Sequence, residues 1–196
     1  MTKNLFNEQL AKGRPCEIAF REMAHKHWGR DNVYDYTNYE MWKDVQGKGI
    51  DFGITSEEWI DEVRVDVKGN FYFSEYNQCL QFDIEYSKWH PSKFNLHNRE
   101  KEVGWIQDSL SDRIYHFEKI KVNDEWVATG NYLYYDKREM ESFIYREWDR
   151  PKGKNWIRDL VYIGSEKSDY AELIPVRLDD KRFEHLIRKV HYVETC

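Results

Sequence analysis

The segment GIDFGITSEEWIDEVRVDVKGN, residues 49–70, decides the fold prediction. Its first six residues and the run from Val63 to Val67 both alternate apolar and polar side chains, the pattern of β-strands with one buried face. The residues SEEW between the two runs have the polar character of a turn, so we predict that the runs pair as neighbouring strands. Each strand then carries an aspartate on the face opposite its apolar residues: Asp51 on the first and Asp66 on the second.

These two aspartates are predicted to converge, because side chains opposite one another on paired strands lie about 5 Å apart. Carboxylates at that separation repel by about 1 kcal/mol in water and by several in less polar surroundings. The pair therefore needs a proton, a cation or solvent. Mg²⁺ would meet this need, since it binds one or two carboxylates together with waters and phosphate oxygens, and the carbonyl of Val67 is a further possible ligand. Lys68 lies about 6–7 Å beyond Asp66 on the same face, within reach of a phosphate or an attacking water.

The rest of the chain mixes predicted helices and strands and contains no internal repeat. Apolar residues at helical spacing predict helices over 16–29, 137–148 and 181–193, the last capped by Asp179 or Asp180. Alternating, aromatic-rich or β-branched runs predict strands over 32–42, 49–54, 59–69, 77–89, 111–122, 125–136, 158–165 and 171–178. The fold class expected from this order is α/β (α+β), a mixed sheet flanked by helices.

Composition limits the kind of protein. The chain has 196 residues, of which 40% are hydrophobic, enough for one sizeable core, so we expect a single domain over residues 1–196. No apolar run approaches the roughly 20 residues of a membrane helix, and the first residues lack the order of a secretory signal, so a cytoplasmic protein without membrane contact is expected. The three cysteines, Cys16, Cys79 and Cys196, are odd in number and widely spaced, which predicts reduced thiols and neither a disulfide framework nor structural zinc.

The net charge of -6 argues against a protein that binds nucleic acid through an overall basic surface. Any DNA contact must therefore be local. Basic segments at 88–101, 146–158 and 180–191 offer such places, the first two interleaving aromatic and basic residues; the alternative is that they are solvated loop and helix faces.

The order and spacing of Glu17, Asp51, Asp66 and Lys68 resemble the PD-(D/E)XK nuclease superfamily, which includes many restriction endonucleases and phage Holliday-junction resolvases. The resemblance covers about residues 14 to 90. It implies a restriction-endonuclease-like fold, with a mixed central β-sheet flanked by helices. The chain departs from the family pattern in two places, since Ile50 stands where the motif has proline and Asp66 stands where glutamate is more frequent.

The resemblance also implies roles for these residues. Asp51 and Asp66 would be the ligands of Mg²⁺ or Mn²⁺, and Glu17 an outer or additional ligand, although Glu22 on the same predicted helix is an alternative. Lys68 would orient the nucleophilic water or help to deprotonate it. The implied activity is metal-dependent hydrolysis of DNA by a phage-type junction resolvase or a restriction-like enzyme, often acting as a homodimer.

Residues that could contact the DNA follow the acidic pair along the chain. The candidates are Lys88, Lys93, Arg99, Lys101 and Gln107.

Two other interpretations of the function stay open. The chain could be an inactive nuclease-fold protein of a phage or mobile element that binds and inhibits a host defence complex, or an accessory protein whose hairpin merely carries solvated ion pairs. The tripeptide alone does not decide, because acid-x-Lys also occurs at residues 179–181.

Overall fold

The computed structural model describes residues 3–76, 78–89, 102–166 and 169–191. The helices are α1 (Lys3–Trp28), the 3-10 helix η1 (Arg30–Asn32), α2 (Tyr39–Gln46), α3 (Trp105–Asp108), α4 (Lys137–Trp148), α5 (Trp156–Leu160) and α6 (Lys181–Glu184). The strands are β1 (Val33–Asp35), β2 (Phe52–Ile54), β3 (Val63–Ser74), β4 (Cys79–Trp89), β5 (Glu102–Val103), β6 (Arg113–Val122), β7 (Glu125–Asp136), β8 (Tyr162–Glu166), β9 (Asp169–Arg177) and β10 (Ile187–His191). The predicted mixture of helices with a mixed sheet is confirmed. Within the described residues, no helix is both long and apolar enough to cross a bilayer.

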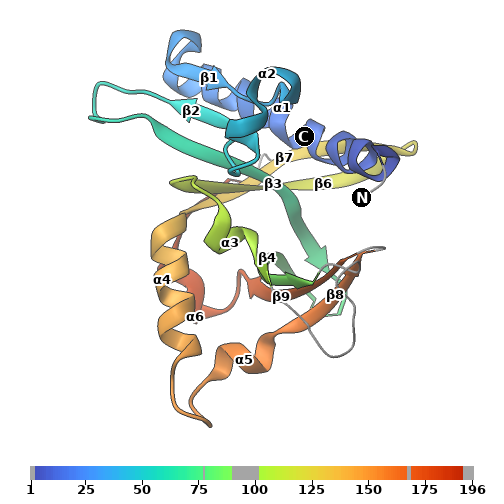
Figure 1. The fold of residues 1–196 in the computed structure, drawn as a ribbon, viewed down its shortest axis with the longest axis vertical. Helices are drawn as coiled ribbons and strands as arrows, with labels where there is room; N and C mark the ends of the chain where they lie inside the picture. The colour runs from blue at the N-terminus through green and yellow to red at the C-terminus, as the bar shows by residue number, and fades with distance from the viewer. Residues whose placement is uncertain (1–2, 77, 90–101, 167–168, 192–196) are drawn as a thin grey trace.

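Strand β3 joins the two halves of the sheet. Its first half pairs antiparallel with β2 and parallel with β6, whereas its last residues, Tyr72–Ser74, pair antiparallel with β4. The path of hydrogen-bonded strands runs β10-β7-β6-β3-β4-β9-β8. Figure 1 shows β3 leaving the layer of β6 and β7 and descending to the layer of β4, β8 and β9. The register with β6 shifts between Lys68 and Phe71, where the strand passes from one layer to the other.

Each layer has its own hydrophobic core. Helix α1 covers one face of the layer that contains β6 and β7, called the upper layer. The core beneath this helix consists of Cys16, Phe20, Ala24, Val33, Phe52, Ile54, Val65, Val67, Tyr115 and Phe117. Gly69 permits this close packing, because a Cβ at that position would lie 2.9 Å from Cys16 Sγ. The second core packs around α4, α5 and α6 and includes Phe71, Phe82, Ile84, Ile114, Leu133 and Tyr135. The predicted buried face of the hairpin is confirmed for Val65, Val67, Ile50, Phe52 and Ile54, while Val63 is half-buried.

Two predicted elements were wrong in type or extent. The predicted strand over 32–42 ends at Asp35, because β1 has only β2 as a partner, and the chain then turns into α2. The predicted helix over 181–193 stops at Glu184, because the chain from Ile187 finds an open edge on β7 and pairs with it as β10. Long-range pairing thus overrides the local helical pattern. Asp180, not Asp179, caps the short helix α6.

The boundaries of other elements also moved. Helix α1 begins at Lys3 and contains Pro15, whereas the prediction began at residue 16. The predicted strand over 158–165 opens as helix α5, whose cap is the Asn155 side chain accepting from Arg158 N–H, and becomes β8 only at Tyr162.

Candidate functional site

The structure brings Asp51 and Asp66 together at the edge of β3. The register pairs Phe52 with Val65, so Asp51, one residue earlier, stands opposite Asp66. Two hydrogen bonds fix this position: Asp51 N–H donates to the Val65 carbonyl over 2.8 Å, and Val67 N–H donates to Asp51 Oδ2 over 2.8 Å. The Asp66 side chain is buried on the face opposite Val65 and Val67. The two carboxylates therefore share one small, poorly solvated region.

This arrangement disfavours the charged form of Asp51. Burial raises the pKa of Asp51 well above its usual value, and the negative charge of Asp66 raises it further. The charge of Lys68 and the hydrogen bond from Val67 N–H act in the opposite direction. Because burial and Asp66 dominate, a proton or a cation at this position is favoured.

Lys68 supplies one positive charge to the pair. Its Nζ lies 2.9 Å from Asp66 Oδ2 and 5.2 Å from the centre of the Trp105 ring. Among the described residues Asp66 Oδ2 accepts no hydrogen bond of good geometry, so its contact with Lys68 is an ion pair. Burial lowers the pKa of Lys68, but the charges of Asp66 and Asp51 outweigh burial and leave the pKa above its usual value. The ammonium is therefore charged at neutral pH.

Glu17 lies within electrostatic reach of the aspartates from helix α1. It is half-buried, and burial raises its pKa; the charge of Arg14 lowers it, and Asp66 contributes to raising it. Glu17 in turn raises the pKa of Asp51. Glu22 is exposed on the same helix. Of these two acids, Glu17 is therefore the one that the structure couples to Asp51 and Asp66.

The donor atoms at this edge suit a hard cation with an incomplete protein shell. In the part of the chain that the structure describes, no three His, Cys, Asp or Glu side chains are grouped to hold a metal by themselves. Two carboxylates are present, however, and the Val67 carbonyl faces the same edge as Asp51, because the N–H and C=O of one residue point to the same side of a strand. Mg²⁺ characteristically accepts one or two carboxylates and completes its octahedron with waters and phosphate oxygens. The residues present fit such an ion, with Glu17 outside the direct ligand set.

Side chains that the sequence did not indicate complete the surroundings of Lys68. Trp105, the first residue of α3, is brought close by Gly104, where a Cβ would lie 2.2 Å from the Glu85 carbonyl oxygen. Its ring covers the Lys68 ammonium. Arg64, which precedes Asp66 on the same face, is held by Asp112 through bonds of 2.9 Å from both Nε and Nη2 and does not reach the aspartate pair as a free cation.

The predicted DNA-contacting residues lie mostly outside the described residues. Lys93, Arg99 and Lys101 belong to the segment 90–101, and for Lys88 only the backbone, in β4, is described. Gln107 lies in α3 and its Nε2 donates to the Tyr86 carbonyl over 3.2 Å. The described contact of Gln107 is thus structural.

A buried hydrogen-bond network centred on His116 lies next to Lys68. His116 lies beside Lys68 in the β3–β6 register and is fully buried against the Phe82 ring, with ring centres 4.2 Å apart. Asn70 Nδ2 donates to a backbone carbonyl over 2.6 Å, so its Oδ1 accepts from His116 Nδ1. His116 Nε2 then accepts from the Tyr135 hydroxyl over 3.0 Å. Burial first, and the charge of Lys68 second, hold the pKa of His116 well below its usual value, so the imidazole is neutral.

This network predicts a loss of stability in mild acid. The unfolded chain binds a proton at His116 near pH 6.5, whereas the folded protein does not, so stability is present above that pH and falls as pH drops toward the folded pKa. By pH 5.5 the loss should be about 1.4 kcal/mol. Because the raised pKa of Asp51 makes stability change in the opposite direction as pH falls, the decisive quantity is the difference between the two proteins. In urea unfolding at pH 7.5 and 5.5, the parent should lose about 1.4 kcal/mol more than His116→Gln. An equal loss in both proteins would show that His116 is not the group responsible.

The structure brings the two aspartates and the lysine on which the resemblance to nucleases rests together at this edge of β3, but this arrangement does not test the resemblance itself. It has no independent support from relatives. Comparisons with protein-family models, with curated proteins and with solved structures found no match for the chain.

Proposed function

We propose that this protein is a Mg²⁺- or Mn²⁺-dependent deoxyribonuclease that hydrolyses phosphodiester bonds at Asp51, Asp66 and Lys68. The observation that carries the proposal is the forced proximity of two poorly solvated carboxylates beside a charged lysine. A structural ion pair needs one acid for one base. Here a second acid is held in place by a backbone hydrogen bond, and its pKa is raised by burial first and by the charge of Asp66 second.

Each residue has a distinct task in this proposal. Asp51 and Asp66, with the Val67 carbonyl, would hold the ion, which supplies charge for the phosphate oxygens and lowers the pKa of a bound water. Lys68 remains protonated and would donate to a non-bridging phosphate oxygen, where negative charge increases as the water oxygen bonds to phosphorus. The water's proton passes to bulk solvent, and the leaving oxygen takes a proton from solvent as its bond to phosphorus breaks. Glu17 strengthens the negative potential that retains the ion.

DNA is the substrate that fits the resemblance, and the net charge requires that contact with it be local. Among the described residues, the segment 146–158 offers such a contact, with Arg158 placed over the Trp148 ring at 5.1 Å. A homodimer would place two sites on the two strands of a duplex or a junction. Within this proposal the chain is a phage-type resolvase or a restriction-like enzyme.

The proposal is tested by metal titration combined with a cleavage assay. At about 100 times its dissociation constant, Mg²⁺ should stabilise the parent by about 2.7 kcal/mol, which corresponds to a rise of about 5–10 °C in Tm. Asp51→Asn should lose this rise and also lose hydrolysis of duplex, single-stranded and four-way-junction DNA. Without metal, the same variant should be at least as stable as the parent, because one of two repelling charges has gone.

Asp61→Asn is the matched control, since Asp61 is an exposed acid of the same hairpin. It should keep both the metal response and the hydrolysis. A parent protein that shows no metal-dependent rise in Tm and cleaves none of the three DNAs would reject the enzyme and favour the alternative, an inactive nuclease-fold protein that binds a host defence complex.

A further inference from the structure

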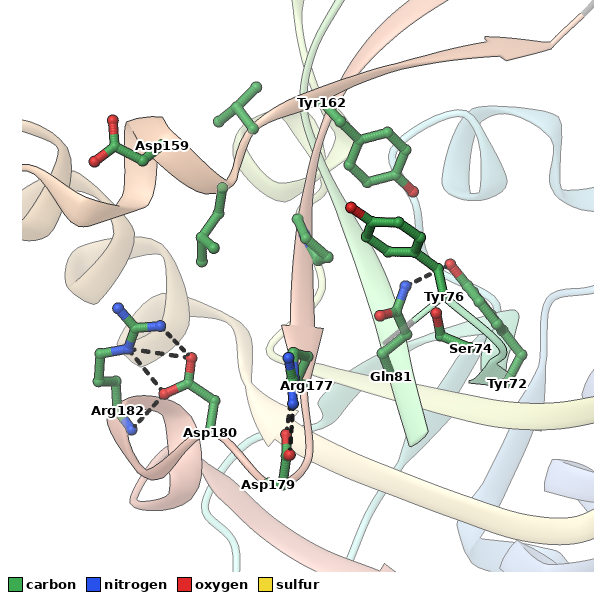
Figure 2. A pocket seen from close by; sticks show the side chains of 13 residues that line it. Tyr72, Ser74, Tyr76, Gln81, Asp159, Tyr162, Arg177, Asp179, Asp180 and Arg182 are labelled. Carbon is green, nitrogen blue, oxygen red and sulfur yellow. Dashed lines mark hydrogen bonds and ion pairs between the residues drawn. The ribbon is translucent and has the colours of Figure 1, made fainter. Parts of the chain in front are cut away.

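A pocket lies at the layer of β4, β8 and β9, and none of Asp51, Asp66 and Lys68 lines it. It has a volume of about 840 Å³ and is formed where the ends of β3, β4, β8 and β9 meet α5 and α6. Its lining comprises Tyr72, Ser74, Tyr76, Gln81, Asp159, Leu160, Val161, Tyr162, Pro175, Arg177, Asp179, Asp180 and Arg182. Figure 2 shows the three tyrosine rings grouped on one side and the two arginines on the other. The volume suits a ligand of nucleoside size.

The tyrosine wall is held in place by a buried carboxylate. The Tyr72 hydroxyl donates to Asp83 Oδ2 over 2.8 Å and accepts from Gln81 Nε2 over 2.8 Å. Tyr162 interacts with the same carboxylate and with Tyr72, and burial raises the pKa of Asp83. Two of the three rings are therefore positioned before any ligand arrives, which reduces the entropic cost of binding.

The charges of the pocket disfavour a phosphate as the ligand. Arg177 binds Asp179 through Nε and Nη2, at 2.9 and 2.6 Å, and Arg182 binds Asp180 in the same manner, with a shortest distance of 2.6 Å. With Asp159, three aspartates face two arginines, so the lining carries a net charge of -1. Such a pocket favours an uncharged, planar and polar group over an anion.

Aromatic faces are available for such a group. Tyr76 is almost fully exposed, at 95%, and Tyr162 is 38% exposed. Leu160, Val161 and Pro175 add an apolar surface. Tyrosine faces stack on nucleobases of any sequence, because every base has a π-face.

Strand β3 connects this pocket with the aspartate pair. Asp66, Lys68, Asn70 and Tyr72 alternate along the strand, and Asn70 and Tyr72 both bond to Asp83, the first through its carbonyl and the second through its carboxylate. Tyr72 lies six positions after Asp66 on β3, which is at most about 20 Å along an extended strand. A DNA strand whose phosphate lies at Asp66 can therefore place a nearby nucleotide over the pocket.

We infer that this pocket binds an unpaired nucleobase of the DNA, stacked against Tyr76 and Tyr162, a few nucleotides from the scissile phosphate. The inference rests on the proposed function for its choice of ligand. An unpaired base is also what a branched or partly opened duplex offers near a cleavage site.

The test compares a single-stranded hexadeoxynucleotide with an abasic hexamer of the same length and charge. Binding is measured with EDTA present, so that hydrolysis plays no part. The parent should bind the base-containing hexamer about tenfold more tightly than the abasic one. Tyr76→Ala should remove most of this difference. Phe73→Ala is the matched control, since Phe73 is the next residue to Tyr72 on β3, is 56% exposed and does not line the pocket; it should leave the difference unchanged.

The result separates this inference from the proposed activity. Asp51→Asn should bind the hexamer as tightly as the parent even though hydrolysis is lost, and a protein that cleaves no DNA but prefers the base-containing hexamer would still support the pocket. The inference is overturned if the parent binds neither hexamer, if it binds both equally, or if Tyr76→Ala and Phe73→Ala behave alike.

Discussion

Lys68→Ala should lower the rate of DNA hydrolysis by about 10²–10³-fold while keeping a Mg²⁺-induced rise in Tm at least as large as that of the parent. The reason is the division of tasks at the site. In the proposed mechanism, the ammonium would stabilise negative charge on the phosphate as the water attacks, whereas Asp51 and Asp66 would hold the ion. Asp51→Asn should lose both properties, so the two variants separate metal binding from stabilisation of the transition state.

Lys68→Ala should also lower the stability of the protein, an effect that does not depend on hydrolysis. It leaves the buried Asp66 without the ammonium that lies 2.9 Å away. Removing one partner of a fully buried ion pair costs about 3–5 kcal/mol. The cost should be smaller here because the Lys68 side chain is 28% exposed. Mg²⁺ should restore more stability to this variant than it adds to the parent, since the ion replaces the missing charge.

Lys121→Ala provides a control of matched geometry. Lys121 Nζ also lies 2.9 Å from an aspartate, Asp124, but both partners are exposed, at 53% and 95%. Exposed pairs contribute about 0–1 kcal/mol, so this variant should unfold almost as the parent does and cleave at the same rate. If Lys68→Ala resembled Lys121→Ala in calorimetry and in the cleavage assay, Lys68 would be an ordinary surface residue and the mechanism would be wrong.

The hairpin that carries the site could be predicted because its information is local. Alternation places Val65 and Val67 on one face and Asp66 on the other, and a short connection allows only antiparallel pairing with the preceding run. The position of Asp51 opposite Asp66 then follows from the register. The sequence could not rank Glu17 above Glu22, because the direction in which α1 crosses β3 depends on packing, including the contact between Cys16 and Gly69.

Contacts between distant parts of the chain could not be predicted from the sequence. Trp105 covers Lys68 only because α3 packs against β4, and His116 reaches Asn70 only because β6 pairs in parallel with β3, which lies 46 residues earlier along the chain. The pattern of apolar and polar residues along the sequence does not indicate which distant segments will pair. The same reason explains the error at residues 187–191, where an edge of β7 converts a helical pattern into β10.

Val65→Asp should destabilise the protein by about 4 kcal/mol or more, a large part of the 5–15 kcal/mol that typically holds a domain together. Val65 is fully buried in the core beneath α1, opposite Phe52 on β2 and among the apolar side chains of that core. The substitution therefore both removes packed methyl groups and buries an unpaired polar group.

The matched control is Val127→Asp, which makes the same change at a strand valine that is 43% exposed and should shift stability by about 0.5 kcal/mol or less. Unfolding in urea, monitored by circular dichroism, measures both variants. If Val65→Asp remained folded with the parent's urea midpoint, residue 65 would face solvent, and a strand register displaced by one residue would turn Asp66 to the other face. Asp51 and Asp66 could then not converge, and the metal site would fail together with the register.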